Sequence, residues 1–128
     1  MPNFYLPASK QTPEIDFKFD ENHLSMKGES YPENAGAFYG RVMEELRAYL
    51  SGGSGRNIVV DVALRYFNSA STKLVFKFVE ELDTAATNEG SIRLNWLFEE
   101  EDDMLREFGE NLQEDFTSLD INLQETTY

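Results

Sequence analysis

Apolar residues recur along this chain with two different periods, which predict strands and helices in alternation. Three segments alternate between polar and apolar residues, as half-buried strands do: 14–20, 23–28 and 91–98. Only the polar pair Glu21 and Asn22 separates the first two, so these are predicted to form a hairpin. Segment 58–64 is an almost continuous apolar run rich in β-branched residues, which favours a strand buried on both faces.

Three further segments carry apolar residues at the three-to-four spacing of a buried helix face. The first begins after Ser30, where Glu33 follows three residues later and Pro32 suits a first turn, so a capping box is predicted. The stripes are Ala35, Phe38, Val42, Leu46 and Tyr49 or Leu50; then Leu74, Val75, Phe78, Val79, Leu82 and Ala86; then Leu105, Phe108, Leu112 and Phe116. We expect a last edge strand at 119–123 and a short disordered tail at about 124–128.

The order of these elements predicts an α/β fold with one domain over residues 1–128. Helices between successive strands imply parallel neighbours joined by right-handed crossovers, with the helices lying against the sheet. The expected architecture is a mixed β-sheet of about four to six strands with three helices packed on it.

The charge of the chain narrows the class of partner. It has 24 acidic and 11 basic residues, a formal net charge of −13, with most of the excess after residue 98. Such a chain repels nucleic-acid phosphates and anionic lipid, and its apolar runs fall short of the roughly 18 residues that a membrane span needs. Neither nucleic acid nor membrane insertion is therefore expected. With no visible secretory signal and no cysteine, a cytoplasmic location is expected.

Three features that could carry chemistry have simpler explanations. The glycine cluster at 52–55 precedes a strand and lacks a following Gly-Lys-Ser/Thr, so it indicates a loop. The acidic run 99–103 suits a helix start and lacks the spaced ligands of a calcium loop. His23 alone cannot form a catalytic triad. We therefore expect no enzyme activity, cofactor or metal; a small ligand- or metal-binding domain using Asp102 and Asp103 is the alternative.

The segment from Asn68 to Lys73 lies where a predicted buried strand leads into a helix, and it carries three hydroxyls. They belong to Ser69, Ser71 and Thr72. One of them is expected to cap the helix. A phosphorylation site is the second interpretation, because a phosphoryl group there would meet free backbone N–H groups, with Lys73 and Lys77 close by. It would add roughly −1.5 to −2 charges to a net charge of −13, which changes the field of the whole protein little. Because charge effects fade within roughly 8–10 Å in salt solution, the phosphoryl group would act locally.

The pattern of strand, Asn-Ser and helix, from Val59 through Asn68 and Ser69 to Leu74, resembles the phosphorylation turn of STAS domains, the fold of anti-sigma-factor antagonists. Two further stretches, 9–15 and 24–34, resemble the SiaC-type family of bacterial regulatory phosphoproteins. The specific part is Gly-x-Ser-Tyr-Pro-Glu-Asn, which ends at Asn34. The resemblance runs from about residue 12 to residue 116.

The resemblance implies a STAS-like domain that acts as a non-catalytic partner switch. Proteins of this family are phosphorylated by a dedicated Ser/Thr kinase and dephosphorylated by a PP2C-type phosphatase. In the unphosphorylated form they bind and activate a diguanylate cyclase, which raises cyclic-di-GMP and promotes aggregation or biofilm. The acceptor directly follows an Asn and falls on Ser69, with Ser71 and Thr72 less favoured. An anti-sigma-factor antagonist with the same switch is the alternative.

Partner contacts are expected in two segments. They are Asn68, Ser71, Thr72 and Lys73 at the turn, and Tyr31, Glu33 and Asn34 before the first helix. Two roles are open for Tyr31: an exposed aromatic anchor for a partner, or a hydrophobic staple ahead of the helix cap.

Overall fold

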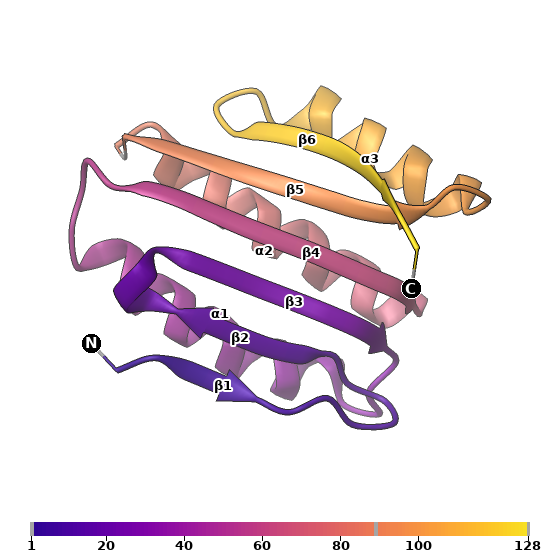
Figure 1. Ribbon diagram of the computed structural model, residues 1–128. Coiled ribbons are helices and arrows are strands. Elements are labelled where there is room, and N and C mark those ends of the chain that lie inside the picture. The colour runs from indigo at the N-terminus through magenta and orange to yellow at the C-terminus, as the bar shows by residue number, and fades with distance from the viewer. Residues whose placement is uncertain (1, 89, 128) are drawn as a thin grey trace.

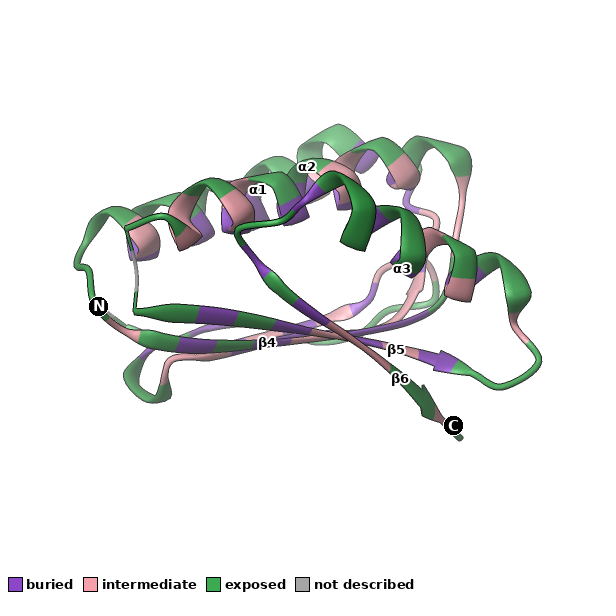
Figure 2. Ribbon diagram, turned by 90° about the horizontal axis from the view of Figure 1, so that it is seen from above, coloured by how far each residue is buried: buried purple, intermediate pink, exposed green. Residues whose placement is uncertain are grey.

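Six strands form one sheet, and all three helices lie against the same face of it (Figures 1 and 2). The structure is a computed structural model that describes residues 2–88 and 90–127. The strands are β1 (Phe4–Leu6), β2 (Glu14–Lys18), β3 (His23–Ser30), β4 (Asn57–Phe67), β5 (Ser91–Glu99) and β6 (Asp120–Thr126). The helices are α1 (Ala35–Ser51), α2 (Ser69–Ala86) and α3 (Asp103–Asp115), and a 3-10 turn, η1, spans Phe19–Glu21.

The strands lie in the sheet in the order of the sequence, from β1 to β6. The pairs β1–β2 and β2–β3 are antiparallel, and every later pair is parallel. One helix joins each parallel pair, as strands that run in the same direction require. The predicted α/β class, the mixed sheet and the hairpin of β2 and β3 are confirmed.

The core lies between the sheet and the three helices. Its largest fully buried side chains include Trp96, Tyr39, Phe17 and Phe78. In β5 and in the first part of β4, buried positions alternate with exposed or half-buried ones, because successive side chains of a strand point to opposite faces. The helices cover one of those faces only (Figure 2).

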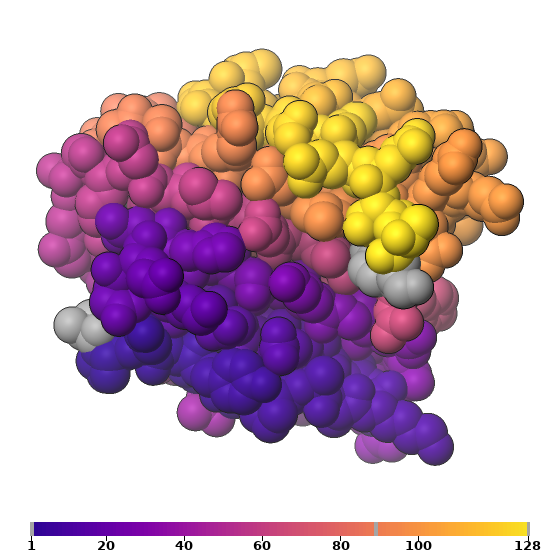
Figure 3. All heavy atoms as spheres, in the orientation of Figure 1, coloured from indigo at the N-terminus to yellow at the C-terminus, as the bar shows by residue number. Residues whose placement is uncertain are grey.

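The prediction that β4 is buried on both faces is wrong. Ile58, Val60 and Val62 are fully buried, whereas Val59 is 38% exposed and Asp61 is half-buried on the other face. That face carries side chains from strands along the whole chain (Figure 3). Polar side chains contact one another across this face: Asp61 Oδ2 lies 2.7 Å from His23 Nε2, and Asp61 Oδ1 accepts a hydrogen bond from Asn95 Nδ2 at 2.8 Å. A continuous apolar run therefore did not require cover on both sides.

The predicted capping box at Ser30 is also wrong. Ser30 is the last residue of β3, pairs with Phe67 and is fully buried. Helix α1 begins later, capped by Asn34, whose Oδ1 accepts from the N–H of Ala37 at 3.0 Å. The pairing of β3 with β4 shifts register after Gly28, which has φ +122°, and then continues to Ser30.

Both ends of the chain contribute more strand than the sequence indicates. The short strand β1, which pairs with β2, was not predicted. Strand β6 extends to Thr126, so the expected disordered tail is wrong over 124–126. The tail residue Tyr128 lies outside the described residues.

Candidate docking and phosphorylation site

The site is built at the turn from β4 into α2. Asn68 is the N-cap of α2, and its Oδ1 accepts from the N–H of Ser71 at 2.9 Å. The N–H of Asn68 donates to the carbonyl of Ser30 at 3.0 Å, which fixes the turn to the end of β3. The expectation that one of the three hydroxyls caps the helix is wrong, because the amide of Asn68 takes that role.

The three hydroxyls of the turn differ in their surroundings. Ser69 is the first residue of α2 and is exposed. Ser71 is fully buried, with its Oγ 3.0 Å from that of Ser30. Thr72 is half-buried, and its Oγ1 donates to the carbonyl of Asn68 at 3.1 Å. Of these three residues only Ser69 is exposed, and it is the position that the resemblance assigns to the phosphoacceptor.

Beneath the turn lies a buried cluster of three hydroxyls, from Ser30, Tyr39 and Ser71. The Tyr39 hydroxyl lies 2.6 Å from Ser30 Oγ, which in turn contacts Ser71. Burial raises the pKa of Tyr39 to about 12, and hydrogen bonds from both serines oppose this rise. The cluster joins the end of β3, α1 and the first turn of α2. Because Tyr31 directly follows Ser30, it also connects the two segments that the sequence suggests for partner binding.

The second predicted segment lies beside the first. Glu33 and Asn34 are exposed, whereas Tyr31 is half-buried with its ring edge-on to Tyr66 of β4, 5.9 Å between centroids. A staple directly precedes the N-cap, but Tyr31 lies three residues before Asn34, so the staple interpretation is wrong. Lys73 is exposed one turn into α2.

The pair of rings gives a testable expectation. A double-mutant cycle of Tyr31→Ala and Tyr66→Ala should show a coupling free energy of about 0.5–1.5 kcal/mol, because an edge-on aromatic pair contributes that much beyond its buried area. The measurement is urea denaturation of the wild type, both single variants and the double variant. Strictly additive losses would show that the rings do not support each other.

Next to the turn is a groove that the sequence did not indicate. Its volume is about 290 Å³, and it lies between the end of β4 and the first turns of α2 and α3. It is lined by Arg65, Tyr66, Phe67, Thr72, Asp102, Met104, Leu105 and Phe108. These residues come from three separate segments, so no local motif could have revealed them.

The acidic run behaves as a helix start. Asp102 is the N-cap of α3 and accepts from the N–H of Leu105 at 3.1 Å, and Asp103 pairs with Arg106 at 2.8 Å. Among residues 2–88 and 90–127, no cluster of three or more acidic or histidine side chains is arranged to hold a metal ion. In that same part of the chain, none of the helices combines the length and apolar character needed to cross a bilayer.

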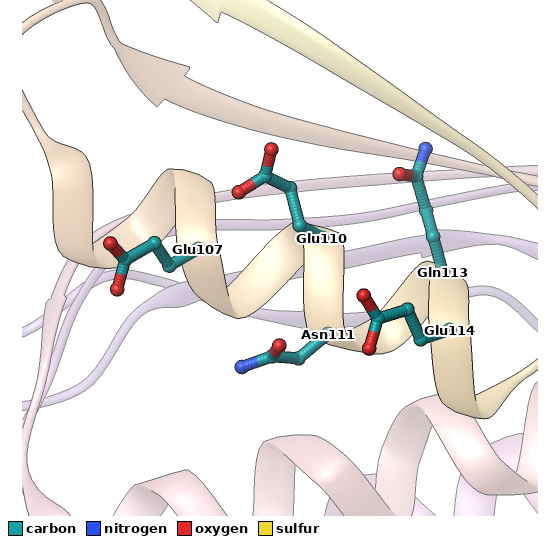
Figure 4. Close-up of a pocket in the computed structure, with 5 residues that line it drawn as sticks. All are labelled: Glu107, Glu110, Asn111, Gln113 and Glu114. Atoms are coloured by element: carbon teal, nitrogen blue, oxygen red, sulfur yellow. The ribbon is translucent and has the colours of Figure 1, made fainter.

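The outer face of α3 carries a second concentration of carboxylates. A shallow hollow of about 500 Å³ is lined by Glu107, Glu110, Asn111, Gln113 and Glu114, and the glutamates spread from the helix in different directions (Figure 4). Gln113 instead donates to the carbonyl of Ile121 at 2.9 Å. The hollow is a solvated helix surface with no convergent set of groups.

Comparison with known proteins agrees with this geometry. The sequence model of the SiaC family, described as SiaC family regulatory phosphoprotein, matches residues 6–126. The chain therefore belongs to the SiaC family of regulatory phosphoproteins. It is 29% identical over 115 residues to a protein of Pseudomonas aeruginosa strain UCBPP-PA14, with 90% of each chain covered.

Solved structures show the same fold. Apo-SiaC from Pseudomonas aeruginosa is 27% identical and superposes with a TM-score of 0.88, covering 97% of this chain and 99% of that one. A second structure with the same TM-score and identity is the diguanylate cyclase SiaD in complex with its activator SiaC, where the match covers 96% of this chain and 99% of the other.

Proposed function

We propose that this chain is a cytoplasmic, non-catalytic partner switch: unphosphorylated, it binds and activates a diguanylate cyclase, and phosphorylation of Ser69 ends the interaction. Family membership supports the regulatory role, and the solved complex of a related SiaC with its cyclase supports the class of partner. The observation that carries the choice of residue is the exposure of Ser69 directly after the cap Asn68.

The position of Ser69 suits a phosphoryl group. The first N–H groups of a helix lack partners within the helix and, together with the helix dipole, favour an anion there. Lys73 lies four residues further on, on the same side of α2, and can approach the phosphate. A doubly charged group within a contact surface must be desolvated when a partner docks, which opposes binding.

The same geometry bears on the two enzymes that would operate the switch, a Ser/Thr kinase and a PP2C-type phosphatase. Ser71 is enclosed with Ser30 and Tyr39, so its modification would require the first turn of α2 to open. The hydroxyl of Thr72 is bonded to the backbone. Ser69 can reach an enzyme's active site without such a change.

Substitution of Ser69 tests the proposal. Ser69→Ala should bind the host's diguanylate cyclase as the wild type does, and Ser69→Asp should bind at least about tenfold more weakly, a loss of about 1.4 kcal/mol. The assay is the affinity for the purified cyclase and its rate of cyclic-di-GMP synthesis. Ser54→Asp is the matched control, since Ser54 is also an exposed serine but precedes the opposite end of β4.

Equal affinity of Ser69→Ala and Ser69→Asp for the cyclase would reject the switch.

Mass spectrometry of protein isolated from its host provides the second measurement: the peptide containing Ser69 should carry a phosphate that a phosphatase removes. Co-purification that recovers an anti-sigma factor in place of a cyclase would assign the same switch to a different partner.

A further inference from the structure

We propose that the groove between β4, α2 and α3 is the part of the docking surface that receives an apolar side chain of the partner, and that a basic residue of the partner lies against the acidic start of α3. This inference rests on the proposed function, because it identifies the chemistry of the partner segment that meets the phosphorylation turn. Three independent features support it: exposed apolar side chains, a one-sided charge, and the place of Ser69.

The first feature is the concentration of apolar groups. Among the described residues, four large hydrophobic side chains are exposed, and two of them line this one groove. Met104 is 84% exposed and Tyr66 is 53% exposed. Phe67 and Phe108, with centroids 5.1 Å apart, are half-buried beside them. A flexible thioether next to aromatic rings is a surface that adapts to an inserted apolar side chain.

The second feature is charge. A shallow hollow adjoining Met104 is lined by Glu99, Glu101, Asp102 and Asp103. The cation on this part of α3, Arg106, is bound to Asp103. Arg65 lines the other side of the groove, on β4. A partner whose lysine or arginine faces the α3 side would therefore be complementary, and an acidic partner would be repelled there.

The third feature connects the groove to the switch. Ser69 and Thr72 are three residues apart on α2 and therefore lie on one side of the helix. Thr72 lines the groove, so a phosphoryl group on Ser69 would stand beside its mouth. Phosphorylation would then act within the docking contact itself, in agreement with the short range of charge effects in salt solution.

The ε-methyl signals of methionine provide the probe. Met104 lies in the groove, whereas Met26 and Met43 are buried in the core and serve as internal references. On addition of a synthetic amphipathic peptide of leucine and lysine, the Met104 signal should shift and saturate while the two core signals stay in place. A peptide of leucine and glutamate should leave Met104 unchanged. A Met104 signal that responds to neither peptide, or to both alike, would overturn the inference.

A pair of charge reversals tests the position of the cation. The loss of affinity for the leucine–lysine peptide should be at least about five times larger in Glu101→Lys than in Glu110→Lys. Both substitutions change the net charge equally, but of the two residues only Glu101 lies beside the groove. Equal losses would show that the peptide responds only to net charge, and would reject the site.

Titration with the purified cyclase separates the two proposals. If the cyclase binds and the Met104 signal shifts, both stand. If it binds without affecting Met104, the groove inference fails and the proposed function stands. If no cyclase binds while the lysine peptide does, the groove stands and the cyclase assignment fails.

Discussion

Replacing Gly109 by alanine is expected to destabilise the protein by about 1–2 kcal/mol, even though alanine is the better helix former. Gly109 is buried in the middle of α3. A Cβ atom there would lie 2.6 Å from both Leu123 Cδ2 and Trp96 Cδ1. Trp96 has little room to move, because its Nε1 donates to the carbonyl of Leu105 at 2.8 Å. Two contacts this close place the overpacking cost in the upper part of its usual range of about 1–3 kcal/mol, so it exceeds the helix-propensity gain of about 1 kcal/mol.

Gly40→Ala is the matched control. Gly40 is also inside a helix, but a Cβ atom there would have nothing within 4 Å. Alanine should stabilise the protein by about 0.5–1 kcal/mol at this position. Urea denaturation of both variants checks the pair through the transition midpoint at constant slope. If both variants gained stability, the close approach of α3 to β5 and β6 would be wrong.

The close approach at Gly109 matters for the site as well as for the core. Helix α3 carries Met104 and Asp102 at its start, and these residues form one wall of the groove. A helix displaced from β5 and β6 would shift that wall. Gly109→Ala should therefore lower the affinity for a partner in addition to lowering stability, whereas Gly40→Ala should change stability alone.

Much of the fold could be predicted from the spacing of apolar residues. The alternation at 14–20 and 23–28 gave the hairpin, and the stripes gave three helices between strands. Both predictions depend on which face of a strand or helix is buried, and the spacing of apolar residues within that segment indicates this face. The direction of the parallel strands then followed from the length of the connections.

The errors occurred where distant residues decide the local structure. Ser30 matches a capping pattern, but its contacts are with Tyr39 and Ser71, 9 and 41 residues away. Asn34 offers an equally good cap and is free to act as one because β3 continues through Ser30. The short strand β1 exists because β2 offers an edge to pair with, and three residues carry no alternation that a sequence pattern could detect.

The candidate site shows the same division. The resemblance indicated Ser69, and local chemistry alone could not separate it from the neighbouring hydroxyls. The difference arises because the side chain of Ser71 is directed at Ser30, a contact across two elements. The groove depends on the meeting of β4, α2 and α3, so no pattern within one of these segments indicates that Met104 lines it.

The buried hydroxyl cluster should make the protein sensitive to alkaline pH. The pKa of Tyr39 is about 12 in the folded protein, against about 10 for an unfolded tyrosine. Between these values the unfolded chain releases the proton while the folded chain retains it. The unfolded state then binds fewer protons, so the free energy of unfolding falls as the pH rises through this window, by about 2–3 kcal/mol in total for this group.

Tyr39→Phe isolates this effect from the titration of other groups. At neutral pH the variant should be less stable than the wild type by about 1 kcal/mol, because it lacks the hydrogen bond to Ser30. As the pH rises above 10 the wild type loses stability that the variant keeps, so the order of the two should reverse. Urea denaturation of both proteins from neutral pH to about pH 11.5 measures the difference. A difference that stays constant over this range would show that Tyr39 ionises as readily in the folded chain as in the unfolded one. It would then contradict the burial of the hydroxyl cluster, and with it the argument that Ser71 is shielded from phosphorylation.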